Sequence, residues 1–415
     1  MMSPSYRSTR AACYAAYIVQ AVTVNLPPLL FVIFREQFGV TYEELGRLVL
    51  LNFVTQLTVD FLSGWFCDRL GIRRTAILAH LCCVAGLISL GVLPRVWTGS
   101  PYAALMISSV VYAMGAGFLE VIISPTIESL PSTGKSASMS ILHSFYCWGQ
   151  AGVVLLSTLF LLAFGNTVWY VLPLVWSLLP LCNLFVFLRV PLVPPLPPEK
   201  TATLRQLLSS RTILLAFAVM VGAGASELAM SQWASMLAER GLGLSKAWGD
   251  VLGPCLFAVL MGTTRVLGPL LYRRFQLADV LLFASAFCIF CYALTVFSTS
   301  PGLSLAGCAM TGAAVALMWP ATISLAAGRI PNGGTRMFAL LAAFGDIGCS
   351  LGPWLTGLVS DLVQANGPAM ARAAAAGLTA EQAGLKSGLA AAGIFPVLMI
   401  VCLLLLREKR AGSAR

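Results

Sequence analysis

Five ionisable side chains interrupt the long apolar stretches of this 415-residue sequence: Asp60, Glu120, Glu227, Arg265 and Asp346. Only 10% of the chain is charged and 58% is hydrophobic, so a charge within an apolar stretch is conspicuous. Charges are costly in hydrocarbon, and ionisable residues there usually face a cavity and have a function. Two kinds of chemistry follow: proton binding and release at the carboxyl groups, and binding of a polar or anionic solute.

Glu120 and Glu227 have similar surroundings. They lie in GAGFLEVIISP and GAGASELAMSQW, each just after a Gly-Ala-Gly sequence that permits tight helix packing. A carboxylate partly removed from water is suited to exchanging protons. We predict that Glu120 and Glu227 are proton-coupling residues. The alternative is that each is a structural acid satisfied by neighbouring hydroxyl or backbone groups.

The stretch SILHSFYCWGQ concentrates polar and aromatic side chains within two to three helical turns. His143, Tyr146 and Gln150 recur at helical spacing, and Trp148 is nearby. Aromatic faces stack on apolar ring faces while amides hydrogen-bond hydroxyl groups, so the set suits a small polyhydroxylated solute. The alternative for His143 is a satisfied packing residue.

Other apolar stretches add candidates for solute binding. The sequences MSQWASM and LMWPAT each combine tryptophan with a polar side chain or a proline, and Pro125 and Pro320 are expected to kink their helices around a cavity. Arg265 has three interpretations: a ligand for an anionic solute, a partner of Glu120, or a structural strut. The predicted additional solute-binding residues are Asn25, Gln232, Trp233, Arg265, Trp319 and Asp346.

Membrane-spanning helices must position these residues. Apolar runs of about 20 residues, the length that crosses hydrocarbon about 30 Å thick, recur along nearly the whole chain. Runs such as LLFVIF do not alternate as strands of a transmembrane barrel would. We predict an all-α integral membrane fold of about twelve helices, at 12–34, 43–66, 75–94, 101–130, 137–163, 167–189, 212–238, 247–271, 278–297, 302–328, 336–363 and 386–406.

A proline-rich segment divides the chain into two halves. VPLVPPLPPEKTATLRQLLSSR contains prolines that cannot continue a helix and that favour an extended linker. We therefore expect one six-helix bundle over residues 1–190, a cytoplasmic linker over 191–211 and a second bundle over 212–415. The first ten residues precede a long apolar span without a small-residue cleavage site, so no cleaved signal peptide is predicted.

The distribution of positive charge predicts orientation. With these spans and a cytoplasmic amino terminus, most of the 26 lysines and arginines fall in cytoplasmic loops, as the positive-inside rule requires. Both termini are then cytoplasmic, in the inner (plasma) membrane of the cell. Topology accounts for the net charge of +10, and no nucleic-acid partner is expected.

The two halves carry traces of an internal repeat. EQFGVTYEELG aligns with ERGLGLSKAWG, which places Gly39 on Gly243 and Thr41 on Ser245, each ahead of an apolar helix. Those hydroxyl groups are predicted to cap the helices that follow. Duplicated halves related by an axis along the membrane normal are one of the transporter architectures, with the binding site between them near the midplane.

The charged loop SGWFCDRLGIRRT follows the second predicted helix. It resembles the signature of the major facilitator superfamily, Gly-x-x-x-Asp-Arg-x-Gly-x-Arg-Arg, and contains every element of it as Gly64, Asp68, Arg69, Gly71, Arg73 and Arg74. The resemblance implies a cytoplasmic gate in which Gly64 permits close helix approach and Asp68 faces the positive end of a partner helix. We expect Arg73 and Arg74 to reach Glu128. The alternative is a basic loop that only sets topology.

Asp60 shares one helix face with Gly64 and Asp68, at spacings i, i+4 and i+8. It therefore belongs either to the interface between the two halves, near Asp346, or to the solute site. Both interpretations stay open at this stage.

A second resemblance covers about thirty residues. LEVIISP followed by LHSFYCWGQ is similar to helices 4 and 5 of the fucose-permease-like sugar:proton symporter family. In that family a helix-4 glutamate five residues before a proline is central to coupling, and Glu120 and Pro125 match this spacing. The family's helix-1 acid has no counterpart here, since this helix contains VTVNLPPLL and offers only Asn25 as a polar candidate.

The resemblances imply a secondary transporter that moves a small, sugar-like polar solute by alternating access, most simply as a proton symporter and a monomer. A proton-coupled exporter of drugs or amphiphiles is the alternative within transport, and a non-transporting receptor is another. We find no HExxH, Walker loop or GxSxG with a partner, and we expect no enzyme. No metal or cofactor is expected, since Cys288 and Cys291 lack a second ligand pair. The expected partners are the solute, protons and the lipid bilayer.

Overall fold

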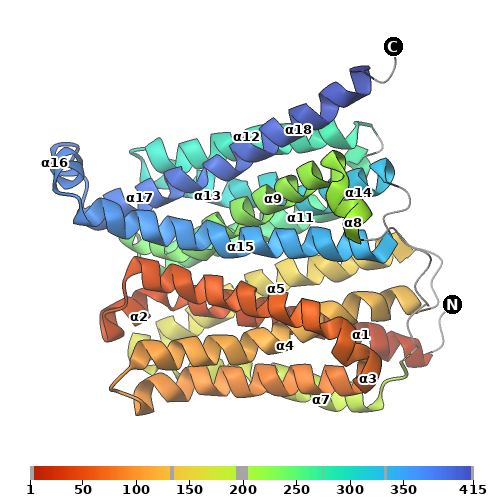
Figure 1. Ribbon diagram of the computed structural model, residues 1–415. Coiled ribbons are helices and arrows are strands. Elements are labelled where there is room, and N and C mark those ends of the chain that lie inside the picture. Colours follow the sequence, from red (N-terminus) through yellow and green to blue (C-terminus); the bar gives the residue numbers. More distant parts are fainter. Residues whose placement is uncertain (1–3, 131–134, 193–203, 273, 331–333, 413–415) are drawn as a thin grey trace. The chain divides into compact units, whose positions relative to one another are not determined.

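The computed structural model describes residues 4–130, 135–192, 204–272, 274–330 and 334–412, and every regular element within these ranges is a helix (Figure 1). Eleven helices are long and apolar enough to cross a membrane, or up to twelve if the bent pair α1 and α2 forms one span. The all-α, multi-pass fold class predicted from the sequence is confirmed.

Contacts group the chain into two units. The first unit comprises Met1–Thr41 and Leu51–Leu196, and the second comprises Tyr42–Leu50 and Pro197–Arg415. The described helices from the amino terminus to the linker are α1 (Pro4–Leu29), α2 (Phe31–Phe38), α3 (Tyr42–Val96), α4 (Pro101–Ser129), α5 (Lys135–Phe164), the short η1 (Asn166–Val168), α6 (Val171–Trp176) and α7 (Leu178–Arg189).

The helices after the linker are more often interrupted. They are α8 (Leu204–Ser209), α9 (Arg211–Met236), η2 (Leu237–Gly241), α10 (Lys246–Asp250), η3 (Val251–Cys255), α11 (Leu256–Tyr272), α12 (Leu277–Phe297), α13 (Pro301–Val315), α14 (Met318–Arg329), α15 (Gly334–Ala365), α16 (Gly367–Ala375), α17 (Ala380–Ala392) and α18 (Ile394–Gly412). The elements η2 and η3 are π-helical.

Several helix breaks have local causes. Pro27 and Pro28 end α1, and α2 leaves it at 45°. Pro320 explains the break between α13 and α14, because a proline ring clashes with the carbonyl four residues earlier, here that of Ala316. The expected interruption of helix 10 is therefore present, one turn before the proline. Helix α4, in contrast, runs through Pro125 without a break.

The Gly-Ala-Gly sequences pack helices closely, as their composition predicted. In α4, a Cβ at Gly115 would lie 2.5 Å from Cys83 Sγ, and one at Gly117 would lie 3.0 Å from Val59 Cβ, both on α3. In α9, a Cβ at Gly224 would collide with the backbone of Gly345 in α15. Helices α9 and α15 lie side by side within the second unit (Figure 1).

Helix capping differs from the sequence prediction. Ser245 occupies the position before α10, but its side chain accepts no capping hydrogen bond. At the start of α3, within the second unit, the carboxylate of Asp361 accepts hydrogen bonds from the backbone N–H groups of Tyr42 and Glu43, at 3.3 and 2.6 Å. A carboxylate from a distant part of the sequence thus satisfies two N–H groups at the start of α3, and the cap by Thr41 stays a prediction.

Candidate functional site

Two hydrogen bonds connect α1 and α4 in the first unit. Gln20 Nε2 donates to Glu120 Oε2 at 2.9 Å, and one turn away the hydroxyl groups of Tyr17 and Ser124 are 2.9 Å apart. Tyr17 and Gln20 are spaced i, i+3 on α1, and Glu120 and Ser124 are spaced i, i+4 on α4, so each pair shares a helix face. The predicted coupling acid is thus held by an amide on helix 1.

Gln20 is the residue that sequence reasoning missed. It lies within the first predicted span, but only Asn25 was considered there. Gln20 is 7% exposed, and burial of an amide that needs hydrogen-bond partners is itself informative. The available signal was the i, i+3 spacing of Tyr17 and Gln20, which places two polar groups on one face of an otherwise apolar span.

Helix α5 adds side chains to this polar cluster. Tyr146 lies 3.4 Å from Asn25, measured from the hydroxyl to Nδ2, and the ring of His143 meets that of Tyr17 edge-on at 5.3 Å. The structure therefore brings three predicted solute-binding residues, Asn25, His143 and Tyr146, together beside the α1–α4 hydrogen bonds. Gln150 is also buried, whereas Trp148 is 43% exposed.

In the second unit the buried acid has a positive partner. Arg265 Nη2 lies 3.2 Å from Glu227 Oε2, and the two side chains are 14% and 8% exposed. Arg265 Nε also donates to the carbonyl oxygen of Ala316 at 3.3 Å. This carbonyl lies four residues before Pro320, which cannot donate the usual helical N–H to it. The proline break therefore supplies an acceptor for the arginine.

The pairing of Arg265 with Glu227 was not among the three interpretations drawn from the sequence. It is close to the structural-strut interpretation, because Arg265 on α11 joins Glu227 on α9 to the break between α13 and α14. The two acids with similar sequence surroundings, Glu120 and Glu227, consequently have different partners: a neutral amide and a guanidinium group.

The other predicted residues of the second unit differ in whether their polar side-chain atoms have hydrogen-bond partners. Trp233 is fully buried and its Nε1 donates to Pro353 O at 3.0 Å. The neighbouring Gln232 is 2% exposed, yet its Nε2 has no hydrogen-bond partner among the described residues. The Trp319 ring packs against Gly345, beside Asp346, which is 4% exposed. An unpartnered buried amide is unusual in a native protein and suits a ligand or water.

Asp60 lies near the first-unit cluster. A Cβ at Gly117, one turn before Glu120, would lie 3.0 Å from Val59 Cβ and 3.1 Å from Gln56 Cα on α3, in the turn that precedes Asp60. Both interpretations of Asp60, as part of the interface between the halves or of the solute site, stay predictions.

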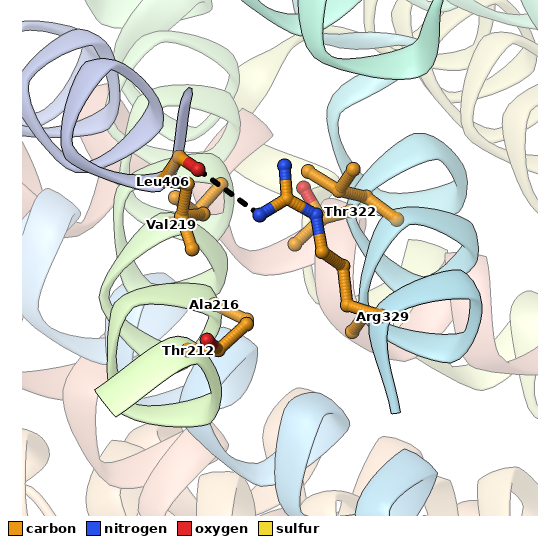
Figure 2. A pocket seen from close by; sticks show the side chains of 8 residues that line it. Thr212, Ala216, Val219, Thr322, Arg329 and Leu406 are labelled. Atoms are coloured by element: carbon orange, nitrogen blue, oxygen red, sulfur yellow. Dashed lines mark hydrogen bonds between the residues drawn. The ribbon is translucent and has the colours of Figure 1, made fainter. Parts of the chain in front are cut away.

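A small cavity lies apart from all of these residues. It is lined by parts of α9, α14 and α18 (Figure 2). Arg329 extends across it and donates from Nη1 to Leu406 O at 3.0 Å, while Thr212, Ala216 and Val219 line the opposite side. None of the predicted site residues lines this cavity.

Comparison with known proteins identifies the family. The family model of the Major Facilitator Superfamily matches residues 13–353. The chain belongs to the major facilitator superfamily. None of the curated proteins matches the sequence. The chain is a multi-pass membrane transporter rather than an enzyme, as the sequence resemblance implied.

Solved structures of this superfamily share the fold at low sequence identity. A D-xylose-proton symporter is 14% identical over 97% of each chain, with a TM-score of 0.74. A bacterial homologue of the human lysosomal transporter Spinster is 14% identical over 98% of each chain, also with a TM-score of 0.74. FucP in the outward conformation is 15% identical over 97% of this chain and 99% of its own, with a TM-score of 0.62. These likenesses establish the fold.

The superfamily signature loop is partly described. Gly71 has φ 75° and ψ 159°, a conformation essentially restricted to glycine, and it kinks α3 at the start of the span Leu70–Val96. The backbone conformation at this signature position therefore requires glycine. The side chains of Asp68, Arg69 and Glu128, and the surroundings of Gly64, lie outside the described residues.

Arg73 of the signature binds the end of α7. Its guanidinium donates to the carbonyl oxygens of Phe187, Leu188 and Val190 at 2.7, 2.6 and 2.8 Å. These are orphan carbonyls of a helix end, where a positive charge is favourable. The sequence led us to expect Glu128 as a partner of Arg73 and of Arg74, which is exposed; because the Glu128 side chain is not described, this stays a prediction. The described contacts of Arg73 attach the signature loop to α7 of the same unit.

Proposed function

We propose that this superfamily member is a proton-coupled symporter of a small, sugar-like polar solute that works by alternating access. It acts as a monomer in the inner membrane, with both termini in the cytoplasm. The observation that carries the proposal is the Gln20–Glu120 hydrogen bond, which gives a carboxyl group of a candidate membrane span a neutral partner on α1, the helix that also carries Asn25. Two structural relatives are named as proton symporters, the D-xylose-proton symporter and the E. coli fucose:proton symporter FucP, which agrees with this assignment.

Glu120 is the better of the two coupling candidates. Its one described hydrogen bond comes from a neutral amide, so protonation of Glu120 neutralises the carboxylate without leaving a positively charged partner unpaired. Protonation of Glu227 would leave the largely buried guanidinium of Arg265 without its counter-charge, which is unfavourable in a low-dielectric interior. We assign proton coupling to Glu120. Glu227 remains a second candidate, and its carboxylate also forms the ion pair with Arg265.

The solute-binding assignment rests on the chemistry of the side chains. In the first unit, Asn25, His143, Tyr146 and Gln150 supply amide, imidazole and hydroxyl groups beside aromatic rings, with Trp148 nearby on the same helix. In the second, the unpartnered Nε2 of Gln232 is suited to a solute hydroxyl oxygen. Trp233, Trp319, Asp346 and Arg265 complete the proposed set; the signature residues and Glu128 are assigned to a cytoplasmic gate.

Transport assays on purified protein test the function. Proteoliposomes are offered monosaccharides and other small polar solutes, with and without an inward proton gradient. The proposal predicts gradient-driven accumulation of one narrow class of sugars. Absence of uptake combined with proton release from the lumen on addition of lipophilic cations would instead support an exporter of amphiphiles.

A further inference from the structure

We propose that Gln20 is a positioning residue that follows the protonation state of Glu120 by reversing its side-chain amide. In the ionised state the Gln20 N–H donates to the carboxylate; in the protonated state the acid's O–H donates to the Gln20 carbonyl. The inference rests on the proposed coupling role of Glu120 and deepens it. It assigns a role to the partner that neither the superfamily signature nor the predicted site includes.

The geometry supports both states. The 2.9 Å between Gln20 Nε2 and Glu120 Oε2 is a normal N–H···O separation and also lies within the range of an O–H···O hydrogen bond. A rotation of the amide by about 180° exchanges its oxygen and nitrogen without moving the helices. The other Gln20 amide atom, Oε1, accepts no hydrogen bond from a described residue, so no described contact opposes this rotation.

The surroundings make such a partner necessary. A carboxyl group partly removed from water, as Glu120 is, has a desolvation cost in whichever of its two states lacks a hydrogen bond. A fixed cation, such as Arg265 beside Glu227, satisfies only the ionised state. An amide is neutral and has both a donor and an acceptor at the same reach, so it can satisfy both states. The proton that Glu120 binds comes from water and returns to water. Between Gln20 and Glu120, only the direction of the hydrogen bond changes.

Other titratable groups surround Glu120, and the test must separate them. On the elements packed near it they are Tyr14 and Tyr17 on α1, Asp60 and Cys83 on α3, Tyr112 on α4 itself, and His143, Tyr146 and Cys147 on α5. A signal assigned to Glu120 must therefore disappear in Glu120→Gln.

Infrared difference spectroscopy during a pH titration tests the proposal without any solute. The purified protein carries glutamine isotope-labelled at its side-chain carbonyl, so this band is separated from the backbone. We expect one carboxyl band that appears on acidification and is lost in Glu120→Gln. A glutamine carbonyl band should shift over the same pH interval, and that shift should be lost in Gln20→Leu.

The chain offers a matched control. Ser124→Ala removes the Tyr17–Ser124 hydrogen bond, which joins the same two helices one turn away, and should leave both bands in place. If Gln20→Leu does not give folded protein, Gln20→Asn keeps an amide but shortens it by one methylene, and the coupled shift should again be lost.

The outcomes separate the inference from the proposed function. A carboxyl band of Glu120 without an accompanying Gln20 shift overturns the amide reversal and leaves the coupling role intact. If Glu120 shows no titrating band while the folded protein accumulates a solute with the proton gradient, both the coupling role of Glu120 and the inference fail.

Discussion

At the residue scale, the two buried acids differ in what protonation costs. Glu120 is paired with a neutral amide and Glu227 with a guanidinium group, although both follow a Gly-Ala-Gly sequence. The same residue type in similar local sequence therefore has different chemistry, because the partner comes from another helix. Three predictions belong to this scale.

Glu120→Gln should abolish proton-driven accumulation and preserve solute exchange across the membrane. Glutamine keeps the size and hydrogen-bonding capacity of the side chain but cannot carry a proton. Uptake and counterflow of the identified solute in proteoliposomes measure the two activities. Glu43→Gln, at a partly buried position outside the cluster, serves as a control for acid removal. Undiminished accumulation by Glu120→Gln would remove it from the coupling mechanism.

Glu227→Gln should destabilise the protein by about 3 kcal/mol, because it leaves the largely buried charge of Arg265 uncompensated. Replacing both residues, in Glu227→Gln with Arg265→Gln, should recover part of that loss. Thermal unfolding of the two single variants and the double variant in detergent measures the interaction energy. Additive losses would mean that the ion pair contributes no coupling.

Gln232→Leu should leave stability unchanged or raise it by about 1 kcal/mol, because it removes a buried amide that lacks a hydrogen-bond partner among the described residues. Solute affinity should fall at the same time. Thermal unfolding and a binding isotherm on one preparation report both quantities. Lower stability with unchanged affinity would show that Gln232 is a packing residue.

At the element scale, breaks in helices create the acceptors and turns that the site uses. Pro320 interrupts the helix at Ala316, whose carbonyl then accepts from Arg265. Gly71 permits the kink in α3 just before Arg73, whose guanidinium lies against the end of α7. Element boundaries thus position charged groups at the ends and breaks of helices.

Gly71→Ala should destabilise the protein by about 1–3 kcal/mol through backbone strain alone. A Cβ at this position would meet no atom within 4 Å, so steric overlap does not contribute. Gly99→Ala is the matched control, since its Cβ also meets nothing and its φ is not positive. Thermal unfolding distinguishes the two variants, and equal midpoints would contradict the strain argument.

At the whole-molecule scale, membrane crossing requires helices whose number and orientation agree with the charge distribution. The structure contains eleven helices that meet the length and hydropathy requirement, or twelve with the bent α1–α2 pair, in two contact units. An even number of spans returns the carboxyl terminus to the side of the amino terminus. Whether α1 and α2 together form one span therefore decides on which side of the membrane the carboxyl terminus lies.

A reporter fused to the carboxyl terminus should be active in the cytoplasm. Fluorescent-protein and alkaline-phosphatase fusions report opposite sides of the inner membrane. A phosphatase fusion truncated after Ser298, between α12 and α13, should be active outside. Phosphatase activity at the full-length carboxyl terminus would mean that α1 and α2 do not form a complete span or that the amino terminus is external.

Much of this protein follows from its sequence alone. Hydrophobic run length determines an all-helical membrane fold because backbone polar groups in hydrocarbon must be bonded within each segment. The loop Ser63–Thr75 carries the superfamily signature, and isolated charges in apolar spans mark Glu120, Glu227 and Arg265 as the unusual residues. These features are local in sequence, so reading along the chain is sufficient to find them.

The partners of those residues were decided only by the tertiary structure. Gln20 lies 100 positions from Glu120, and Arg73 is 114 positions from Phe187; no spacing rule connects such pairs. Asp361 likewise accepts a hydrogen bond from the backbone at the start of α3 across 318 positions of sequence. Helix packing brings these groups within hydrogen-bonding distance, and the free energy of a buried polar group depends on what it meets there.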